Sequence, residues 1–168
     1  MSAARNFAWA QLALLTLLTL LTLGLAGAAT AATVCTVSAL PVAFGVYSPT
    51  AASAHTSTGS VSVVCQPVVA SAIQTYTLTL STGSSGSYAM RRLSASGHTL
   101  NYQLYKDAAY AAVWGDGSSG ASSLSGTLSL SVVLPVSATH TVYGRMPALQ
   151  SGAYAGSYLD TITVMVTY

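Results

Sequence analysis

The final eleven residues of the chain constrain its fold most strongly, because their side chains alternate between two sets. Alternation over β-branched and aromatic residues is typical of a half-buried β-strand. One face of this predicted strand carries Tyr158, Asp160, Ile162, Val164, Val166 and Tyr168. If the strand is interior, it needs a neighbour on each side. The second neighbour must then come from earlier in the chain or from another molecule.

Residues 1–31 have the features of a secretory signal peptide. Arg5 supplies a small positive charge, an apolar run follows over residues 8–25, and small residues then offer cleavage sites ending at Ala28 and Ala31. An uncleaved membrane anchor is the alternative, since 18 helical residues span about 27 Å. We expect export through the Sec pathway.

Cleavage after Ala31 leaves residues 32–168 as one domain, which is large enough for a single sandwich core. The whole chain has five Lys and Arg and three Asp and Glu, and the cleaved domain lacks only Arg5 of these. A nucleic-acid-binding surface needs clustered basic residues, so no nucleic-acid partner is expected. Arg91 and Arg92 are the only adjacent basic residues, and we interpret them as a solvated pair on a loop.

The chain has two cysteines, Cys35 and Cys65. In an exported protein, such a pair predicts a disulfide. Thiol chemistry is the alternative, but neither cysteine has a histidine or a charged residue near it in the sequence.

Residues 34–168 alternate with period 2 nearly throughout and contain no amphipathic pattern of helix length. The predicted strands are residues 34–44, 60–65, 74–81, 99–106, 127–134, 140–146 and 158–168. Residues 50–60 and 115–125 are predicted loops, residues 88–93 an edge strand or an ordered loop, and residues 107–114 a helical turn or a short strand. Short strands at this spacing predict an all-β sandwich.

Two details of these strands can be compared with the structure. Pro41 has no N–H for a sheet ladder, so the first strand should lie at an edge or bend at this residue. Alternation also predicts which side chains share a face. One set is Leu100, Tyr102 and Leu104, which are expected to face inward. The other set is Leu128, Leu130, Val132 and Leu134.

The sequence gives little support for an enzyme. The acidic residues after the predicted cleavage site are Asp107 and Asp116, which suit turns, and Asp160, which lies in the last strand. We expect Asp160 to pair with an arginine, namely Arg91, Arg92 or Arg145. His55, His98 and His140 lie in separate segments without metal-ligand spacing. No catalytic site, metal or cofactor is therefore predicted.

The aromatic residues have two interpretations. Lining a sugar site is one, and packing along the core is the other; their spacing on alternating strands favours packing. The residues concerned are Tyr47, Tyr76, Tyr102, Tyr105, Tyr110 and Trp114. Tyr110 and Trp114 remain candidates for contact with a surface or a glycan.

Several ordered motifs resemble one family. They include Cys35, Phe44-Gly45-x-Tyr47-x-Pro49, Leu100-Asn101-Tyr102-x-Leu104-Tyr105, Trp114-Gly115-Asp116-Gly117, Tyr143-Gly144-Arg145-Met146-Pro147 and Gly156-x-Tyr158-x-Asp160-Thr161. Together they resemble the spore coat protein U domain, which is shared with subunits of archaic chaperone–usher pili. The resemblance covers nearly all of the chain after the predicted signal peptide.

This resemblance implies an incomplete immunoglobulin-like β-sandwich that lacks its last strand. In the family, a periplasmic pilus chaperone fills the gap first and the N-terminal strand of a neighbouring subunit fills it later. An outer-membrane usher assembles the subunits. The resemblance therefore implies a structural subunit of a surface pilus or coat, and a tip adhesin that contacts a glycan or a surface is the alternative. Residues 107–125 and 147–157 are the candidate contact loops.

The resemblance also implies a groove for the donated strand. The predicted lining residues are Ile162, Val164, Val166 and Tyr168 on one side and Val37, Leu40, Val42 and Phe44 on the other. At most six residues separate the predicted cleavage sites from Cys35, and six extended residues reach about 21 Å at most. We therefore expect a strand acceptor with little or no donor segment of its own.

Overall fold

The computed structural model describes residues 33–168, so the predicted signal peptide, residues 1–31, lies outside the described part. The strands are β1 (Cys35–Leu40), β2 (His55–Cys65), β3 (Ala72–Leu80), β4 (Arg91–Ala95), β5 (His98–Tyr105), β6 (Leu124–Leu130), β7 (Val136–Met146) and β8 (Val164–Thr167). One 3-10 turn, η1 (Gly83–Ser85), is the only helical element among residues 33–168. In this part of the chain, no helix is long and apolar enough to cross a bilayer.

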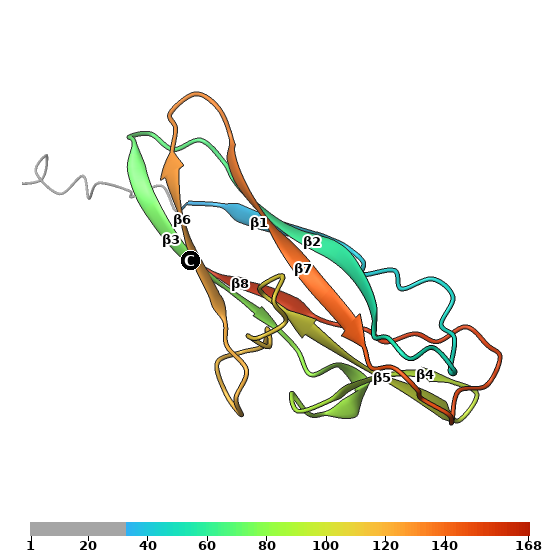
Figure 1. Ribbon diagram of the computed structural model, residues 1–168. Helices are drawn as coiled ribbons and strands as arrows, with labels where there is room; N and C mark the ends of the chain where they lie inside the picture. The colour runs from blue at the N-terminus through green and yellow to red at the C-terminus, as the bar shows by residue number, and fades with distance from the viewer. Residues whose placement is uncertain (1–32) are drawn as a thin grey trace, which may run out of the picture. The chain divides into compact units, whose positions relative to one another are not determined.

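The strands form two sheets (Figure 1). The first has five strands in the order β1-β2-β7-β5-β4, and the second has three in the order β6-β3-β8. All paired strands run antiparallel. This arrangement is an immunoglobulin-like β-sandwich, which confirms the predicted all-β fold class.

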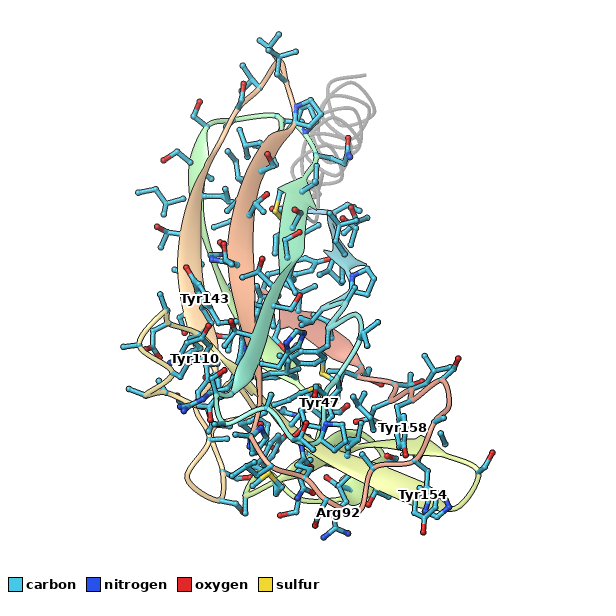
Figure 2. The ribbon with its side chains drawn as sticks, turned by 45° about the vertical axis from the view of Figure 1, so that its right-hand side comes forward. Tyr47, Arg92, Tyr110, Tyr143, Tyr154 and Tyr158 are labelled. Carbon is cyan, nitrogen blue, oxygen red and sulfur yellow. A yellow bond between two sulfur atoms is a disulfide. The ribbon has the colours of Figure 1, made fainter. Side chains whose placement is uncertain are left out.

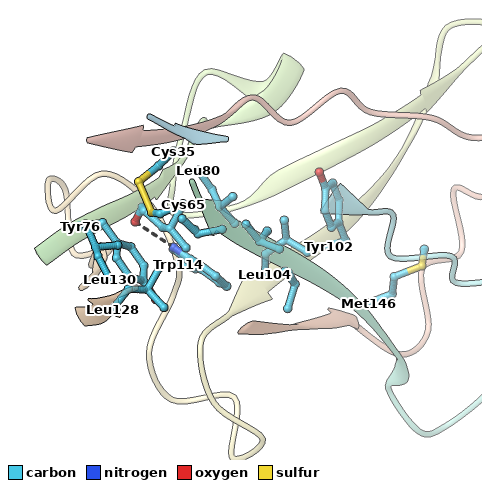
Figure 3. Packing of buried hydrophobic residues seen from close by; sticks show 14 of the residues in the cluster. Cys35, Cys65, Tyr76, Leu80, Tyr102, Leu104, Trp114, Leu128, Leu130 and Met146 are labelled. Carbon is cyan, nitrogen blue, oxygen red and sulfur yellow. Dashed lines mark hydrogen bonds between the residues drawn. A yellow bond between two sulfur atoms is a disulfide. The ribbon is translucent and has the colours of Figure 1, made fainter. Parts of the chain in front are cut away.

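The core is built from the inward faces of both sheets (Figure 3). Its buried residues include Val61, Val63, Tyr76, Leu78, Leu80, Leu100, Tyr102, Leu104, Leu128, Leu130, Val142 and Met146. The prediction that Leu100, Tyr102 and Leu104 face inward is confirmed, because at most 4% of each is exposed. Trp114 also belongs to this cluster and is wholly buried, although it lies outside the named strands.

Several predicted boundaries are wrong. Strand β2 starts at His55, inside a predicted loop, because its Ser, Thr and Gly residues pair with β7 over the full length of the strand. Strand β6 ends at Leu130, so Val132 and Leu134 do not continue its buried face and are exposed instead. Strand β8 covers only Val164–Thr167, because the preceding segment crosses to the other sheet, where Leu159 exchanges hydrogen bonds with Ser94 of β4.

The first strand agrees with the prediction, made from Pro41, that it lies at the edge of a sheet. Strand β1 ends at Leu40 and lies at the edge of its sheet. The chain then packs down onto two glycines. A Cβ atom on Gly59 would lie 2.6 Å from the Leu40 carbonyl oxygen, and one on Gly144 would lie 2.5 Å from a methyl carbon of Val42. These glycines let the segment after β1 approach the sheet closely.

Cys35 and Cys65 form the predicted disulfide. They are cross-strand partners in β1 and β2, with Cα atoms 4.0 Å apart. The disulfide therefore ties the start of the edge strand β1 to the end of β2, the only strand that pairs with β1 among residues 33–168.

Arg91 corrects the interpretation of the arginine pair. Strand β4 sends the two side chains to opposite faces, so Arg91 is wholly buried and Arg92 points outward (Figure 2). The Arg91 guanidinium donates to the carbonyl oxygens of Ser81 (2.8 and 3.1 Å) and Trp114 (2.8 Å) and to the side-chain oxygen of Gln103. Burial lowers the pKa of Arg91. Its role is to join β4 to the core.

Candidate functional site

The edges of the two sheets lie open beside each other. Strand β1 is an edge of the first sheet and β8 an edge of the second, and within residues 33–168 neither has a strand on its outer side (Figure 1). The Tyr168 hydroxyl donates to the Cys35 carbonyl oxygen at 3.3 Å, so the end of β8 lies near the start of β1. Residues of both edges line a common cavity further along. The two edges therefore run antiparallel, and we call the space between them the β1–β8 groove.

The register shows which backbone groups of β1 face the groove. The Val34 carbonyl oxygen accepts from the Gln66 amide at 2.9 Å, so the even-numbered residues of β1 bond to β2. Hydrogen-bonded and non-bonded positions alternate in an antiparallel ladder. The N–H and C=O groups of Val37 and Ala39 consequently point away from β2 and into the groove.

The same argument applies to β8. The Thr163 carbonyl oxygen accepts from the Ser81 amide at 3.0 Å, so the odd-numbered residues of β8 bond to β3. The backbone groups of Val164 and Val166 therefore point outward. Both sides of the groove present backbone donors and acceptors that a further strand would pair.

A cavity of about 270 Å³ opens between the edges. Most of its lining is apolar, and Asp160 is the only acidic or basic residue among the lining residues, all of which the structure describes. Its apolar and aromatic lining residues are Ala39, Leu40, Pro41, Val42, Phe44, Val61, Leu80, Leu93, Tyr102, Leu104, Val142, Ile162 and Val164. The groove thus combines unpaired backbone with an apolar floor.

The structure brings most of the predicted groove residues together. Leu40, Val42 and Phe44 line the cavity from the β1 side, and Ile162 and Val164 line it from the β8 side.

The other three predicted groove residues lie outside the cavity lining. Val37 and Val166 are half-buried and pack against the core, and Tyr168 is 49% exposed at the end of β8. Leu80, Leu93 and Leu104 form part of the floor but were not predicted, because their position depends on how the strands are ordered in the sheets.

Asp160 does not pair with an arginine as predicted. Its Oδ2 accepts from the Tyr102 hydroxyl at 2.6 Å, and its Oδ1 accepts from the amides of Ser84 (2.8 Å) and Thr161 (2.9 Å). Arg91 donates instead to Ser81, Gln103 and Trp114. Burial, together with the nearby Asp160 carboxylate, raises the pKa of Tyr102.

The prediction that Trp114 could contact a surface or a glycan is wrong. Its side chain is wholly buried, and its indole N–H donates to the Leu78 carbonyl oxygen at 3.3 Å. The backbone explains this position, since the Trp114 amide donates to the Leu104 carbonyl oxygen at 2.9 Å and draws the loop onto β5. Tyr76 and Tyr102 are also buried, so these three residues pack in the core, as the spacing favoured.

Tyr110, the other candidate, belongs to a group of partly exposed side chains (Figure 2). Its ring packs edge-on against Tyr105 and Tyr143, with centroids 5.5 and 6.4 Å away. The Arg145 guanidinium carbon lies 5.6 Å from the centre of the Tyr110 ring. We call these four residues the tyrosine cluster.

The remaining acidic residues stabilise turns, as predicted. Asp107 accepts hydrogen bonds from the amides of Ala109, Ala111 and Ala112, and these bonds lower the pKa of its carboxyl group. Asp116 accepts from the Ser118 amide at 2.8 Å. Residues 33–168 contain no group of three potential metal ligands.

The fold resembles that of a solved pilus protein. The match is to a chain in the crystal structure of the CsuC–CsuE chaperone–tip adhesion subunit pre-assembly complex, from the archaic chaperone–usher Csu pili of Acinetobacter baumannii. The TM-score is 0.52 at 20% sequence identity, and the match covers 82% of this chain and 40% of the other. The chain therefore spans less than half of the protein that it matches, and the likeness is one of fold.

The sequence itself identifies the family. Residues 20–165 match the family model of the Spore Coat Protein U domain. The chain therefore belongs to the spore coat protein U domain family, as its ordered motifs suggested. A search of curated proteins found no match.

Proposed function

We propose that this protein is a structural subunit of a surface pilus or coat, and that its β1–β8 groove accepts a strand from another polypeptide. The pair of open edges above an apolar cavity is the observation that carries this proposal. An open edge invites pairing with another chain, and a strand added there pairs the backbone and fills the pockets beneath. Occupation of the groove completes the sandwich.

The proposed partners follow from the family. A periplasmic chaperone supplies the first strand, an outer-membrane usher receives the complex, and a neighbouring subunit supplies the final strand. The similar solved structure is a chaperone–subunit pre-assembly complex, which supports the first of these steps. The protein then passes from the periplasm to a surface fimbrium or coat.

We propose that the protein donates poorly, because the predicted cleavage sites leave few residues before Cys35 and Val34 already bonds to Gln66 in the sheet. Mass spectrometry of the protein purified from its native host measures its N-terminus. A start many residues upstream of Ala29 would contradict this part of the proposal.

A pair of substitutions in β8 tests the acceptor role. Val164→Asp places a carboxylate in the groove, where burying the charge costs several kcal/mol, and binding of the chaperone should weaken by at least about 100-fold. Met165→Asp puts the same group on the opposite, exposed face of the strand and should leave binding unchanged. Co-purification with the cognate chaperone followed by a titration gives the two affinities. Equal binding of both variants would contradict the proposal.

The tyrosine cluster favours a second function, adhesion to a glycan. Partly exposed aromatic rings offer stacking surfaces, and Arg145 offers hydrogen-bond donors beside them. A glycan array of the wild-type protein and a Tyr143→Ala variant tests this function. The adhesin role predicts bound glycans that the variant loses, whereas an array without any signal would leave the scaffold role alone.

A further inference from the structure

Building on the proposed acceptor role, we propose that Asp160 fixes the register of the donated strand by accepting a hydrogen bond from a polar or basic side chain of that strand. The donated segment would then need apolar residues at several inward positions and a side-chain donor, such as Lys, at one of them. Asp160 is in this sense a residue that determines specificity within the groove.

The order of residues along the groove supports this role. Val166, Val164, Ile162 and Asp160 follow each other at every second position, and each side chain is half-buried on the inward face. A strand in the groove would meet Val166 and Val164 of β8, and then Ile162 and Asp160 of the segment that precedes β8. Asp160 also lines the apolar cavity, so a strand that fills the cavity must come close to the carboxylate.

The Asp160 carboxylate is held in place but keeps accepting capacity. Oδ1 accepts from two amides, whereas Oδ2 accepts only from the Tyr102 hydroxyl among the described residues. A carboxylate oxygen can accept two hydrogen bonds. Gly83 fits against this group without a side chain, since a Cβ atom there would lie 2.2 Å from Oδ2. The carboxylate is therefore fixed by three hydrogen bonds, and by this count Oδ2 retains the capacity for one further donor.

A carboxylate in this position penalises a wholly apolar occupant. Such an occupant would take the carboxylate out of solvent without supplying a further donor, and burying a charged group without compensating hydrogen bonds costs free energy. An occupant with a correctly placed donor avoids that cost. The difference in binding between the two gives the groove its selectivity.

The apolar floor alone cannot determine the register completely. A slip of one residue turns the apolar side chains of a strand outward, so the cavity rejects it. A slip of two residues keeps them inward and moves each by roughly 6.6 Å. Such a slip carries a donor out of reach of Asp160, so the carboxylate distinguishes the registers that the cavity accepts equally.

A set of synthetic peptides tests the proposal on the intact protein. Each peptide carries alternating inward Val residues, with one inward position changed to Lys or to norleucine, which has a similar length but no charge. From one pair of peptides to the next, the changed position moves by two residues, so that it always stays on the inward face. We expect one Lys peptide to bind about tenfold more tightly than its norleucine partner, and Asp160→Asn to reduce this preference to about twofold or less.

Each outcome leads to a different conclusion. If the peptides bind but no Lys position is preferred, or if the preference persists in Asp160→Asn, the register role of Asp160 is overturned. If no peptide binds and the chaperone does not bind either, the acceptor function itself fails. The comparison of Lys with norleucine needs no variant, so it remains decisive even if Asp160→Asn does not fold.

Discussion

Replacing Arg91 with Leu is expected to destabilise the folded domain by roughly 3–5 kcal/mol, because buried backbone acceptors lose their only donor. The substitution leaves the carbonyl oxygens of Ser81 and Trp114 without their donor, whereas the side-chain oxygen of Gln103 keeps the Leu104 amide. Each buried acceptor that loses its partner costs about 1–3 kcal/mol. Denaturation in urea, with the same slope for both proteins, measures the loss.

The neighbouring residue provides a matched control. Arg92 lies next in the same strand but is exposed, so Arg92→Leu should change stability by no more than about 0.5 kcal/mol. Arg91→Lys should recover only part of the loss, because an ammonium group lacks the planar fork of a guanidinium. Equal effects of the Arg91 and Arg92 substitutions to Leu would show that the buried network is not what stabilises β4.

Removing the disulfide has the second large effect. The double variant Cys35→Ala, Cys65→Ala should lose about 3–4 kcal/mol of stability, because the crosslink closes a loop with a sequence separation of 30. The loss should appear first at β1, since β2 is the only strand beside it in the described sheet. Denaturation of the variant and of the oxidised wild-type protein gives the difference.

Two serines in the same strands serve as the control. Ser38 and Ser62 are cross-strand partners in β1 and β2, but no covalent bond joins them. Replacing both with Ala should cost no more than about 1 kcal/mol, since the only bond lost is an exposed one between the Ser62 and Thr139 hydroxyls. A disulfide variant as stable as this control would contradict the account.

The sequence predicted which side chains face the core better than it predicted where each strand begins and ends. Apolar alternation correctly placed Leu100 and Leu104 inward, because a core position needs an apolar side chain on every second residue. It missed the first half of β2, where Ser and Thr residues pair with β7 without apolar alternation. The sequence also failed to predict that Arg91 is buried. Two adjacent arginines suggest a solvated surface unless they are known to lie in a strand, where successive side chains point to opposite faces.

The groove was predictable only in part. Its two edges followed from the family resemblance and from the alternation of the last strand, which placed Ile162 and Val164 on the inward face. The cavity floor was not predictable, because Leu93 and Leu104 reach it from strands at the far side of the first sheet. Trp114 was misplaced for a similar reason, since its position depends on a loop that folds back onto β5.

Hydrogen exchange of single backbone amides, in the free protein and in its complex with the chaperone, tests the central claim most directly. The amides of Val37, Ala39 and Val166 point into the groove, so they should exchange quickly in the free protein and slow by at least about tenfold in the complex. The amides of Ser38 and Met165 face β2 and β3 and should be protected in both states. Full protection of the three groove amides in the free protein, unchanged in the complex, would contradict the account.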